Sequence, residues 1–202
     1  MSGMYHFFFI RHAESTGNAA KIFQGWADFP LSERGLEQAR LLAQEWAREE
    51  RRFDLCISSP LMRARQTAEI FAEALGVAIE FDPDWRELHN GIFAGLTSEA
   101  VGERFSESEM TPYVHYGESG ESRWQLFLRV GNALQRLMDR GPGRYLVVSH
   151  GGALNMAMYA MLGIPLQTIR GPRFYFSNLG FAEVEYDPVK KRWELKRLEN
   201  RE

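Results

Sequence analysis

Short apolar runs of strand length alternate along the chain with longer stretches in which apolar residues recur every three or four positions. The first apolar run covers 5–10, and amphipathic stretches follow at 32–50 and 121–140. Alternation of this kind is typical of strands in a mostly parallel sheet with helices on both of its faces. The pattern therefore predicts an α/β fold with one mostly parallel central sheet, forming a single domain over 1–202.

The other elements follow from the same two periods and from the turn residues between them. Residues 82–120 mix glycine, proline, serine and aromatic residues, with only a short helical pattern near 98–105. This stretch is expected to form loops and a lid inserted between the regular elements. We expect further helices over 60–75 and 152–162, and further strands over 53–57, 77–81, 145–149, 180–186 and 192–198.

Composition places the chain among ordinary globular proteins. It has 202 residues, of which 45% are hydrophobic and 25% charged, and a formal net charge of −3. The lack of a basic excess argues against a nucleic-acid binder, and the composition does not suggest a membrane protein. Because the N-terminus carries no signal-peptide pattern, we expect a cytoplasmic protein. The single cysteine, Cys56, cannot form an internal disulfide and is expected to be buried.

Charged and polar residues gather where predicted strands end. Arg11 and His12 follow the first strand directly, His150 follows a later strand, and Arg63 stands shortly after the second. In open α/β sheets, ligands bind beyond the carboxyl ends of the strands. We therefore expect these two histidines and two arginines to converge on one edge of the sheet.

A pair of arginines beside histidines suits a phosphoryl group. Arg11 and Arg63 can each bind phosphate oxygens with two N–H groups, and both stay charged at any relevant pH. His150 could add a third donor. Gly151 and Gly152 permit close backbone approach, and the helix that follows them points its N-terminal N–H groups at the same anion. The cluster thus supplies the charge stabilisation that phosphoryl transfer requires.

Phosphoryl transfer also requires a nucleophile in line and a proton for the leaving oxygen. His12 is the candidate nucleophile, because a neutral imidazole nitrogen can attack phosphorus when the other ring nitrogen donates to a fixed acceptor. Glu87 is the candidate acid. A carboxyl group near Trp85 and Phe93 could keep its proton through desolvation, although the adjacent Arg86 acts in the opposite direction.

Further short motifs recur along most of the chain in a fixed order. They comprise Arg11-His12, Glu14, Asn18, Gln24-Gly25, Asp28, Pro30-Leu31, Gly35, Gln38-Ala39, Ser58-Ser59-Pro60, Arg63-Ala64, Thr67-Ala68, Glu87, Gly91, Gly95, Gly120-Glu121-Ser122, Arg129-Val130 and His150-Gly151-Gly152. Each fragment is weak alone, but their joint order and spacing are specific. Together they make the chain resemble the histidine phosphatase superfamily, in its phosphoglycerate-mutase-like branch.

This resemblance implies a phosphohistidine intermediate on His12. It implies that Arg11, Arg63 and His150 hold the phosphate, and that Glu87 transfers the proton. It also implies a reaction that needs no metal ion and no other cofactor.

Several other residues are candidates for substrate binding. The same resemblance places Asn18 close to the phosphate pocket. Lys21 and Arg86 could reach a second anionic group on the substrate, and His89 could touch the substrate or simply be exposed. The chain departs from the family at Ala13, where glycine is usual. Because one methyl group restricts the backbone only slightly, we expect activity to be retained.

Three functions stay open at this point: a small-molecule phosphatase, a phosphoglycerate mutase, and a protein-directed or noncatalytic member of the same fold. Mutases that resemble this chain carry a longer insertion after the acid, whereas the interval 88–119 is short. A noncatalytic member would be expected to lack a catalytic group, and all are present. We therefore predict a metal-independent phosphatase whose partner is a small phosphorylated metabolite. The oligomeric state stays open, and a homodimer through the C-terminal strands is one option.

Overall fold

The computed structural model describes residues 3–102, 111–166 and 171–201. Its described part contains a six-stranded sheet in the order β3-β2-β4-β1-β5-β6. Four neighbouring strands, β3, β2, β4 and β1, run parallel, whereas β5 and β6 add an antiparallel edge beside β1. The predicted α/β fold with a mostly parallel sheet is confirmed. The strands are β1 (Tyr5–Arg11), β2 (Leu55–Ser58), β3 (Ile79–Phe81), β4 (Arg144–Ser149), β5 (Phe181–Asp187) and β6 (Arg192–Glu199).

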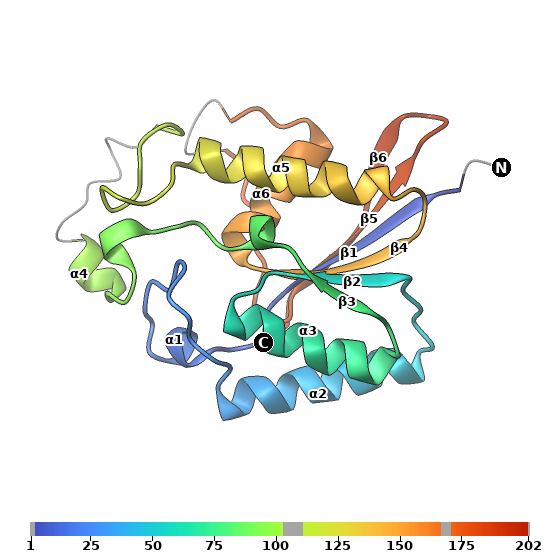
Figure 1. Cartoon of the computed structure of the whole chain (residues 1–202), viewed down its shortest axis with the longest axis horizontal. Helices are drawn as coiled ribbons and strands as arrows, with labels where there is room; N and C mark the ends of the chain where they lie inside the picture. Colours follow the sequence, from blue (N-terminus) through green and yellow to red (C-terminus); the bar gives the residue numbers. More distant parts are fainter. Residues whose placement is uncertain (1–2, 103–110, 167–170, 202) are drawn as a thin grey trace.

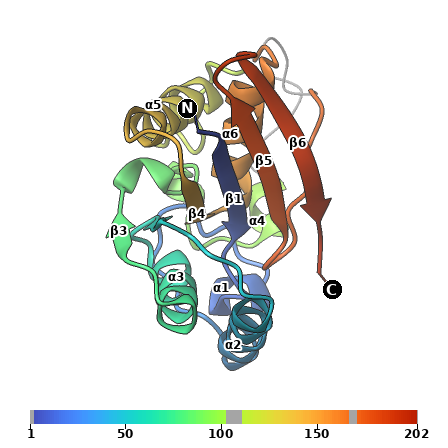
Figure 2. The same cartoon turned by 90° about the vertical axis from the view of Figure 1, so that its right-hand side faces the viewer.

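Helices cover both faces of the sheet, as the pattern predicted (Figures 1 and 2). The helices α2 (Glu33–Arg48) and α3 (Met62–Leu75) pack together on one face, and α5 (Arg123–Asp139) and α6 (Gly151–Leu162) pack together on the other. The shorter elements are α1 (Thr16–Ala19), α4 (Ser98–Gly102) and the 3₁₀ turns Pro83–Trp85 and Gly91–Phe93.

The side chains of β1 show why both faces need cover. Phe7 and Phe9 belong to one hydrophobic cluster, with residues of α5 and α6. Phe8 and Ile10 belong to a second cluster, with residues of α2 and α3. A strand buried on both faces is apolar at every position rather than at alternate ones. This accounts for the unbroken apolar run at 7–10.

Small shifts at the ends of elements have local causes. The helix predicted from 60 begins at Met62, and the strand predicted from 77 begins at Ile79. Val77 is not free to join the strand, because its N–H donates to the Ala72 carbonyl and closes the end of α3. Gly76 allows this closure with a φ of 62°, a left-handed conformation that favours glycine.

In its described part, the interval between β3 and α5 consists mainly of loops, as predicted. Its described part contains two 3₁₀ turns and the short helix α4. The helical pattern near 98–105 is confirmed at Ser98–Gly102, and its remainder lies outside the described residues. The four-residue helix α1 was not predicted. Ser15 and Asn18 form a capping box at its start, in which each side chain accepts a backbone N–H of the other residue.

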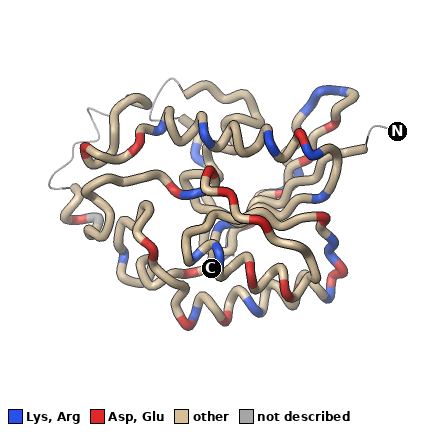
Figure 3. Tube along the Cα trace, viewed as in Figure 1, with Lys and Arg blue, Asp and Glu red and all other residues tan. Residues whose placement is uncertain are grey.

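The distribution of charge and the placement of the cysteine agree with the composition. Basic and acidic positions are interspersed along the trace (Figure 3). Cys56 is buried in β2, and burial raises the pKa of its thiol to about 12, so it acts as a small apolar residue. Among the described residues, no helix is both long and apolar enough to cross a membrane.

Candidate active site

The order of the strands brings the predicted site residues together. The carboxyl ends of β1, β4 and β2 lie side by side, because β4 pairs with both of the others. Arg11 is the last residue of β1, His12 follows it, and His150 follows β4. Arg63 lies in the first turn of α3, shortly after β2. The predicted convergence of two histidines and two arginines on one sheet edge is confirmed.

His12 is held in the tautomer that a nucleophile requires. Its side chain is almost fully buried, with 3% of its surface exposed. The Nδ1 atom lies 2.7 Å from the Ala13 carbonyl oxygen. Since a carbonyl oxygen only accepts, Nδ1 carries the proton and Nε2 keeps a free electron pair. Burial, and then the charges of Arg63 and Arg11, hold the pKa of His12 well below its usual value, so the ring is neutral.

Ala13 is accommodated without strain beside the nucleophile. It is fully buried in the hydrophobic cluster under α2 and α3. Its N–H donates to the hydroxyl of Thr67, 3.1 Å away. Ala13 is not among the described residues with a positive φ, so its backbone does not require glycine. The departure from the family pattern therefore leaves the position of His12 intact.

Backbone carbonyls fix the two arginines in place. Arg63 is 1% exposed, and its two terminal nitrogens donate to the carbonyls of Ala27 at 3.0 Å and Gly25 at 2.8 Å. Arg11 donates through Nη1 to the Phe176 carbonyl at 2.8 Å. Burial lowers the pKa of both guanidinium groups, that of Arg63 to about 10, so both are charged at neutral pH. In each, the buried Nε has no partner within the described residues.

His150 lies next to His12 and is not among the described residues that line the cavity at the site. It is fully buried, and the centroids of the two imidazole rings are 5.0 Å apart. Its Nε2 lies 2.8 Å from the hydroxyl of Ser59, whereas its buried Nδ1 has no partner among the described residues. Burial, followed by the charges of Arg63 and His12, lowers the pKa of His150 well below its usual value. The site therefore holds two neutral imidazoles beside two cationic arginines.

Glu87 faces this group from the loop after β3. One carboxylate oxygen accepts the Gly152 N–H at 3.0 Å, and the other accepts the Leu88 N–H at 2.8 Å. A Cβ atom at position 152 would lie 2.3 Å from the Glu87 carboxylate, so a side chain there would displace that carboxylate. A Cβ at Gly151 would make an ordinary contact with Arg11 at 3.9 Å. At Gly152, therefore, the group that comes close to the backbone is the carboxylate of Glu87.

Arg129 holds the backbone of the segment that carries Glu87. It donates to the carbonyls of Asp84 at 2.7 Å, Arg86 at 2.8 Å and Glu87 at 2.8 Å. The same guanidinium pairs with the carboxylate of Glu121, and both side chains are largely buried. The indole N–H of Trp26 also donates to the Glu87 carbonyl, at 2.6 Å. Arg129 is therefore a positioning residue for the candidate acid.

Replacement of Arg129 by glutamine is expected to lower kcat/KM for an alkyl phosphate by about 100-fold, the cost of moving a catalytic group by roughly 1 Å. The loss with p-nitrophenyl phosphate is expected to be smaller, because its leaving group needs less help from Glu87. Steady-state kinetics with both substrates measures the contrast. Arg136→Gln is the matched control, since Arg136 lies on the same helix and binds the Asp84 carboxylate at the surface. Equal losses with both substrates would contradict a positioning role.

A cavity of about 1190 Å³ opens in front of these residues. Seven of the predicted site residues line it: Arg11, His12, Asn18, Lys21, Arg63, Glu87 and Gly151. The remaining described lining residues are Ile22, Phe23, Gln24, Gly25, Leu88, Asn90, Tyr116, Arg123, Leu126, Gly152, Asn155, Met156, Gly171, Pro172 and Arg173. The volume is ample for a phosphorylated metabolite, since ligand sites typically measure about 300–1000 Å³.

Arg86 and His89 lie beside the cavity rather than in its wall. The guanidinium carbon of Arg86 lies 3.7 Å from the centroid of the Trp26 ring. The ring of His89 meets the same indole edge-on, with 4.6 Å between the two ring centroids. Both residues therefore brace Trp26, which in turn holds the Glu87 carbonyl. Their direct contact with the substrate stays a prediction.

Several residues at the site were not singled out from the sequence. Asn178 donates to the His12 carbonyl at 2.9 Å and to the Asn18 side chain at 3.2 Å. Arg123 and Arg173 line the cavity. No local pattern marks these three residues, because they reach the site through the tertiary fold.

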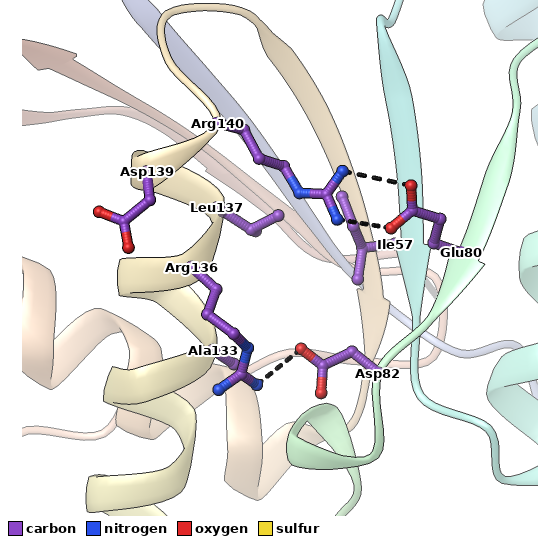
Figure 4. Close-up of a pocket in the computed structure, with 8 residues that line it drawn as sticks. All are labelled: Ile57, Glu80, Asp82, Ala133, Arg136, Leu137, Asp139 and Arg140. Carbon is purple, nitrogen blue, oxygen red and sulfur yellow. Dashed lines mark hydrogen bonds and ion pairs between the residues drawn. The ribbon is translucent and has the colours of Figure 1, made fainter.

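A second hollow, of about 370 Å³, lies between α5 and the strands β2 and β3. Figure 4 shows that ion pairs cross it: Arg140 meets Glu80, and Arg136 meets Asp82. These charges neutralise one another, and the hollow is separate from His12. We also find no cluster of three or more potential metal ligands in the part of the chain that is described.

Comparison with known proteins shows clear similarity over nearly the whole chain. A sequence profile of the histidine phosphatase superfamily (branch 1) matches residues 7–201. The chain is 38% identical over 189 residues to a "probable phosphoglycerate mutase GpmB" of Photorhabdus laumondii, covering 91% of this chain and 86% of that protein. It is 35% identical, with the same coverage, to the protein of the same name in Yersinia pestis.

Solved structures share the same fold. A mycobacterial glucosyl-3-phosphoglycerate phosphatase in complex with VO3 superposes with a TM-score of 0.84 and 23% identity, covering 98% of this chain and 100% of that one. A phosphoglycerate mutase from Bacillus anthracis superposes with a TM-score of 0.77 and 23% identity, covering 96% and 92%. At this identity the two structures establish the fold alone.

Proposed function

Because this chain belongs to the histidine phosphatase superfamily, branch 1, we propose that it hydrolyses a small phosphomonoester through a phosphohistidine on His12. The observation that carries the proposal is the buried His12, with Nδ1 held by the Ala13 carbonyl and Nε2 free beside two arginines. The family membership that the sequence motifs indicated is confirmed. The reaction and the roles of the individual residues are our proposal.

In the first step, Nε2 of His12 attacks phosphorus, a P–N bond forms, and the bond to the leaving oxygen breaks. Glu87 gives its proton to that oxygen, so that a neutral alcohol departs. Arg11 and Arg63 stabilise the charge on the transferred phosphoryl group, and the Nδ1 of the adjacent His150, which has no partner among the described residues, is the atom that would add a third donor. In the second step, Glu87 removes a proton from water, which attacks phosphorus and breaks the P–N bond. Inorganic phosphate leaves, and His12 and Glu87 return to their starting states.

Phosphoglycerate mutase is a second candidate function, because the two curated relatives described above carry that name. A mutase must keep water from the phosphohistidine until a different oxygen of the substrate accepts the group. That requirement favours a closed and extensively contacted pocket. The wide cavity and the short interval 88–119 favour the phosphatase. A protein-directed or noncatalytic member is a third candidate, although all five proposed catalytic groups are present.

The protein is expected to release inorganic phosphate in the presence of EDTA, because no step in the scheme uses a metal ion. A panel of phosphorylated metabolites would be assayed for phosphate release, with the isomerisation of 3-phosphoglycerate followed in parallel. Release from one preferred monoester is the expected result. Isomerisation without release would instead establish a mutase. Loss of turnover in EDTA would overturn the metal-free scheme, and inactivity on the whole panel would favour a protein substrate or a binding function.

A further inference from the structure

The sheet ends at β6, which has a neighbouring strand on one side only. Among the described residues, the backbone of β6 forms ladder hydrogen bonds with β5 alone, and Figure 2 shows it at the border of the sheet. β6 has eight residues, whereas strands usually have about five or six and edge strands are often shorter still. It therefore presents a long row of outward N–H and C=O groups, to which another strand can bind.

The side chains of β6 are sorted by face. Trp193, Leu195 and Leu198 lie on the face of the sheet that α5 and α6 cover. The indole of Trp193 packs on Phe7, with 5.7 Å between the ring centroids. Leu195 and Leu198, in contrast, are 38% and 37% exposed. One face of the edge strand is thus apolar and only partly covered.

The other face of β6 carries charges of alternating sign. Arg192, Glu194, Arg197 and Glu199 follow one another along it, opposite β5 residues whose side chains point to the face of α2 and α3. Within the strand, Arg192 pairs with Glu194, and Arg197 pairs with Glu199. All of these side chains are at least partly exposed, so they are accessible to a further strand.

A bulge keeps the two faces separate over the whole strand. Consecutive residues of β5 lie opposite Leu195 and Arg197, so that Lys196 between them is an extra residue. Side chains of a strand alternate between faces with a period of two. Without the bulge, Leu198 would therefore lie on the charged face. The bulge shifts the alternation by one and returns Leu198 to the apolar face.

Lys196 does not block the outer edge of β6. Lysines and bulges on edge strands commonly hinder pairing with another chain. Here, however, the ammonium group of Lys196 lies 3.6 Å from the carboxylate of Glu185 on β5 and 3.3 Å from that of Glu194. Glu185 and Glu194 lie opposite each other, and the lysine neutralises this pair of like charges. Its charge is thus used inside the sheet.

Counted by these register positions, β6 is complementary to a second, antiparallel copy of itself. A two-fold axis at Leu195 places that residue opposite its own copy. It sets the other positions of one strand against suitable partners on the other, namely Trp193 with Leu198, Arg192 with Glu199, and Glu194 with Arg197. Each pair joins two apolar or two oppositely charged side chains on the same face, and such pairs stabilise antiparallel strands.

We propose that β6 is the interface of a homodimer, in which two copies of the chain pair antiparallel about Leu195 and their sheets join into one. An interface with two-fold symmetry brings the same patch of both copies together, and this requires the self-complementarity that β6 has. The homodimer through the C-terminal strands thereby gains a defined register. The inference is independent of the proposed function, because β6 contributes no residue to the described lining of the cavity.

Sedimentation velocity of the full chain over a series of concentrations tests the proposal. A single strand edge is a small interface, so we expect a reversible equilibrium with a dimer Kd of about 10–100 µM. Arg192→Glu and Glu199→Arg each set like charges against each other at two symmetric places. Each variant alone is expected to dimerise about tenfold more weakly or worse.

An equimolar mixture of the two variants is the decisive measurement. In a mixed dimer the two substituted positions meet each other, and the two native ones meet each other, so both pairs again have opposite charges. The mixture should therefore regain a Kd near that of the unmodified chain. Arg65→Glu is the control, since Arg65 also pairs with a glutamate, Glu69, but lies on α3. It should leave the Kd unchanged.

Three results would overturn the inference. One is a chain that stays monomeric up to about 1 mM. Another is a single variant that dimerises as well as the unmodified chain, since the interface would then lie elsewhere. The third is a mixture that dimerises no better than its separate components, because the register would then be wrong. Circular dichroism would show that each variant is folded, and two misfolded variants could not restore each other.

Discussion

Replacement of His12 by alanine is expected to lower kcat for phosphate release by at least about 10⁴-fold, to the background rate. The reason is that no other group near the arginines offers a free nitrogen in the same place. His150 is the nearest imidazole, but its Nε2 lies 2.8 Å from the Ser59 hydroxyl, and its Nδ1, although without a partner among the described residues, is fully buried and outside the cavity lining. The loss is expected with alkyl and aryl phosphates alike, because both require the phosphoenzyme.

Rapid quenching with a radiolabelled phosphomonoester measures the intermediate directly. The unmodified protein should retain label that is stable in alkali and lost in acid, as expected for a P–N bond, whereas His12→Ala should retain none. His6→Ala is the control, since His6 lies at the other end of β1, where it pairs with Glu185. Label that persists in His12→Ala would place the nucleophile on another residue. Circular dichroism would show that each variant is folded.

The fold was predictable because the signals for its elements are local. The run 7–10 is apolar at every position, and a central strand covered on both faces requires that pattern. The helices over 33–48 and 123–139 are long and amphipathic, and serine caps begin both. The order of the strands in the sheet was not predictable in this way. It depends on contacts between distant segments, and the pattern along the chain does not determine it.

The centre of the site was predictable from one rule about parallel sheets. Polar residues at the carboxyl ends of strands face the ligand, and this rule selects Arg11, His12 and His150 directly. Arg63 follows because it lies in the first turn after a strand. No strand end marks Glu87; it was the candidate acid because of its neighbours Trp85 and Phe93, and the family resemblance implied the same role. Its place is instead set by Arg129 and by the N–H of Gly152.

The outer part of the site was not predictable in the same way. Arg173 and Asn178 lie far along the chain from His12 and come close only through tertiary packing. Arg86 and His89 adjoin Glu87 in sequence, so that proximity suggested substrate contact. The indole of Trp26 competes for both side chains, through a cation–π contact with Arg86 and an edge contact with His89. Sequence spacing carries no information about this competition.

Glu87→Gln is expected to lower kcat/KM for alkyl phosphates by about 10² to 10³-fold, within the usual range for the loss of a general acid. The same change is expected to cost less than about tenfold with p-nitrophenyl phosphate. An alkoxide is a poor leaving group and needs the proton, whereas nitrophenolate departs readily without one. The value of kcat/KM is the proper measure, because it includes the steps up to departure of the alcohol and excludes the later attack by water.

A series of substrates with graded leaving groups makes this prediction sharper than a single pair. Glutamine keeps the shape of glutamate and can still accept an N–H from Gly152 or Leu88, so the loop stays in place. In the variant, kcat/KM should therefore fall more steeply as the leaving group becomes more basic. A uniform loss across the series would mean that Glu87 places the phosphate or its own loop and transfers no proton. The slope thus separates acid catalysis from positioning, which the size of the loss with one substrate cannot do.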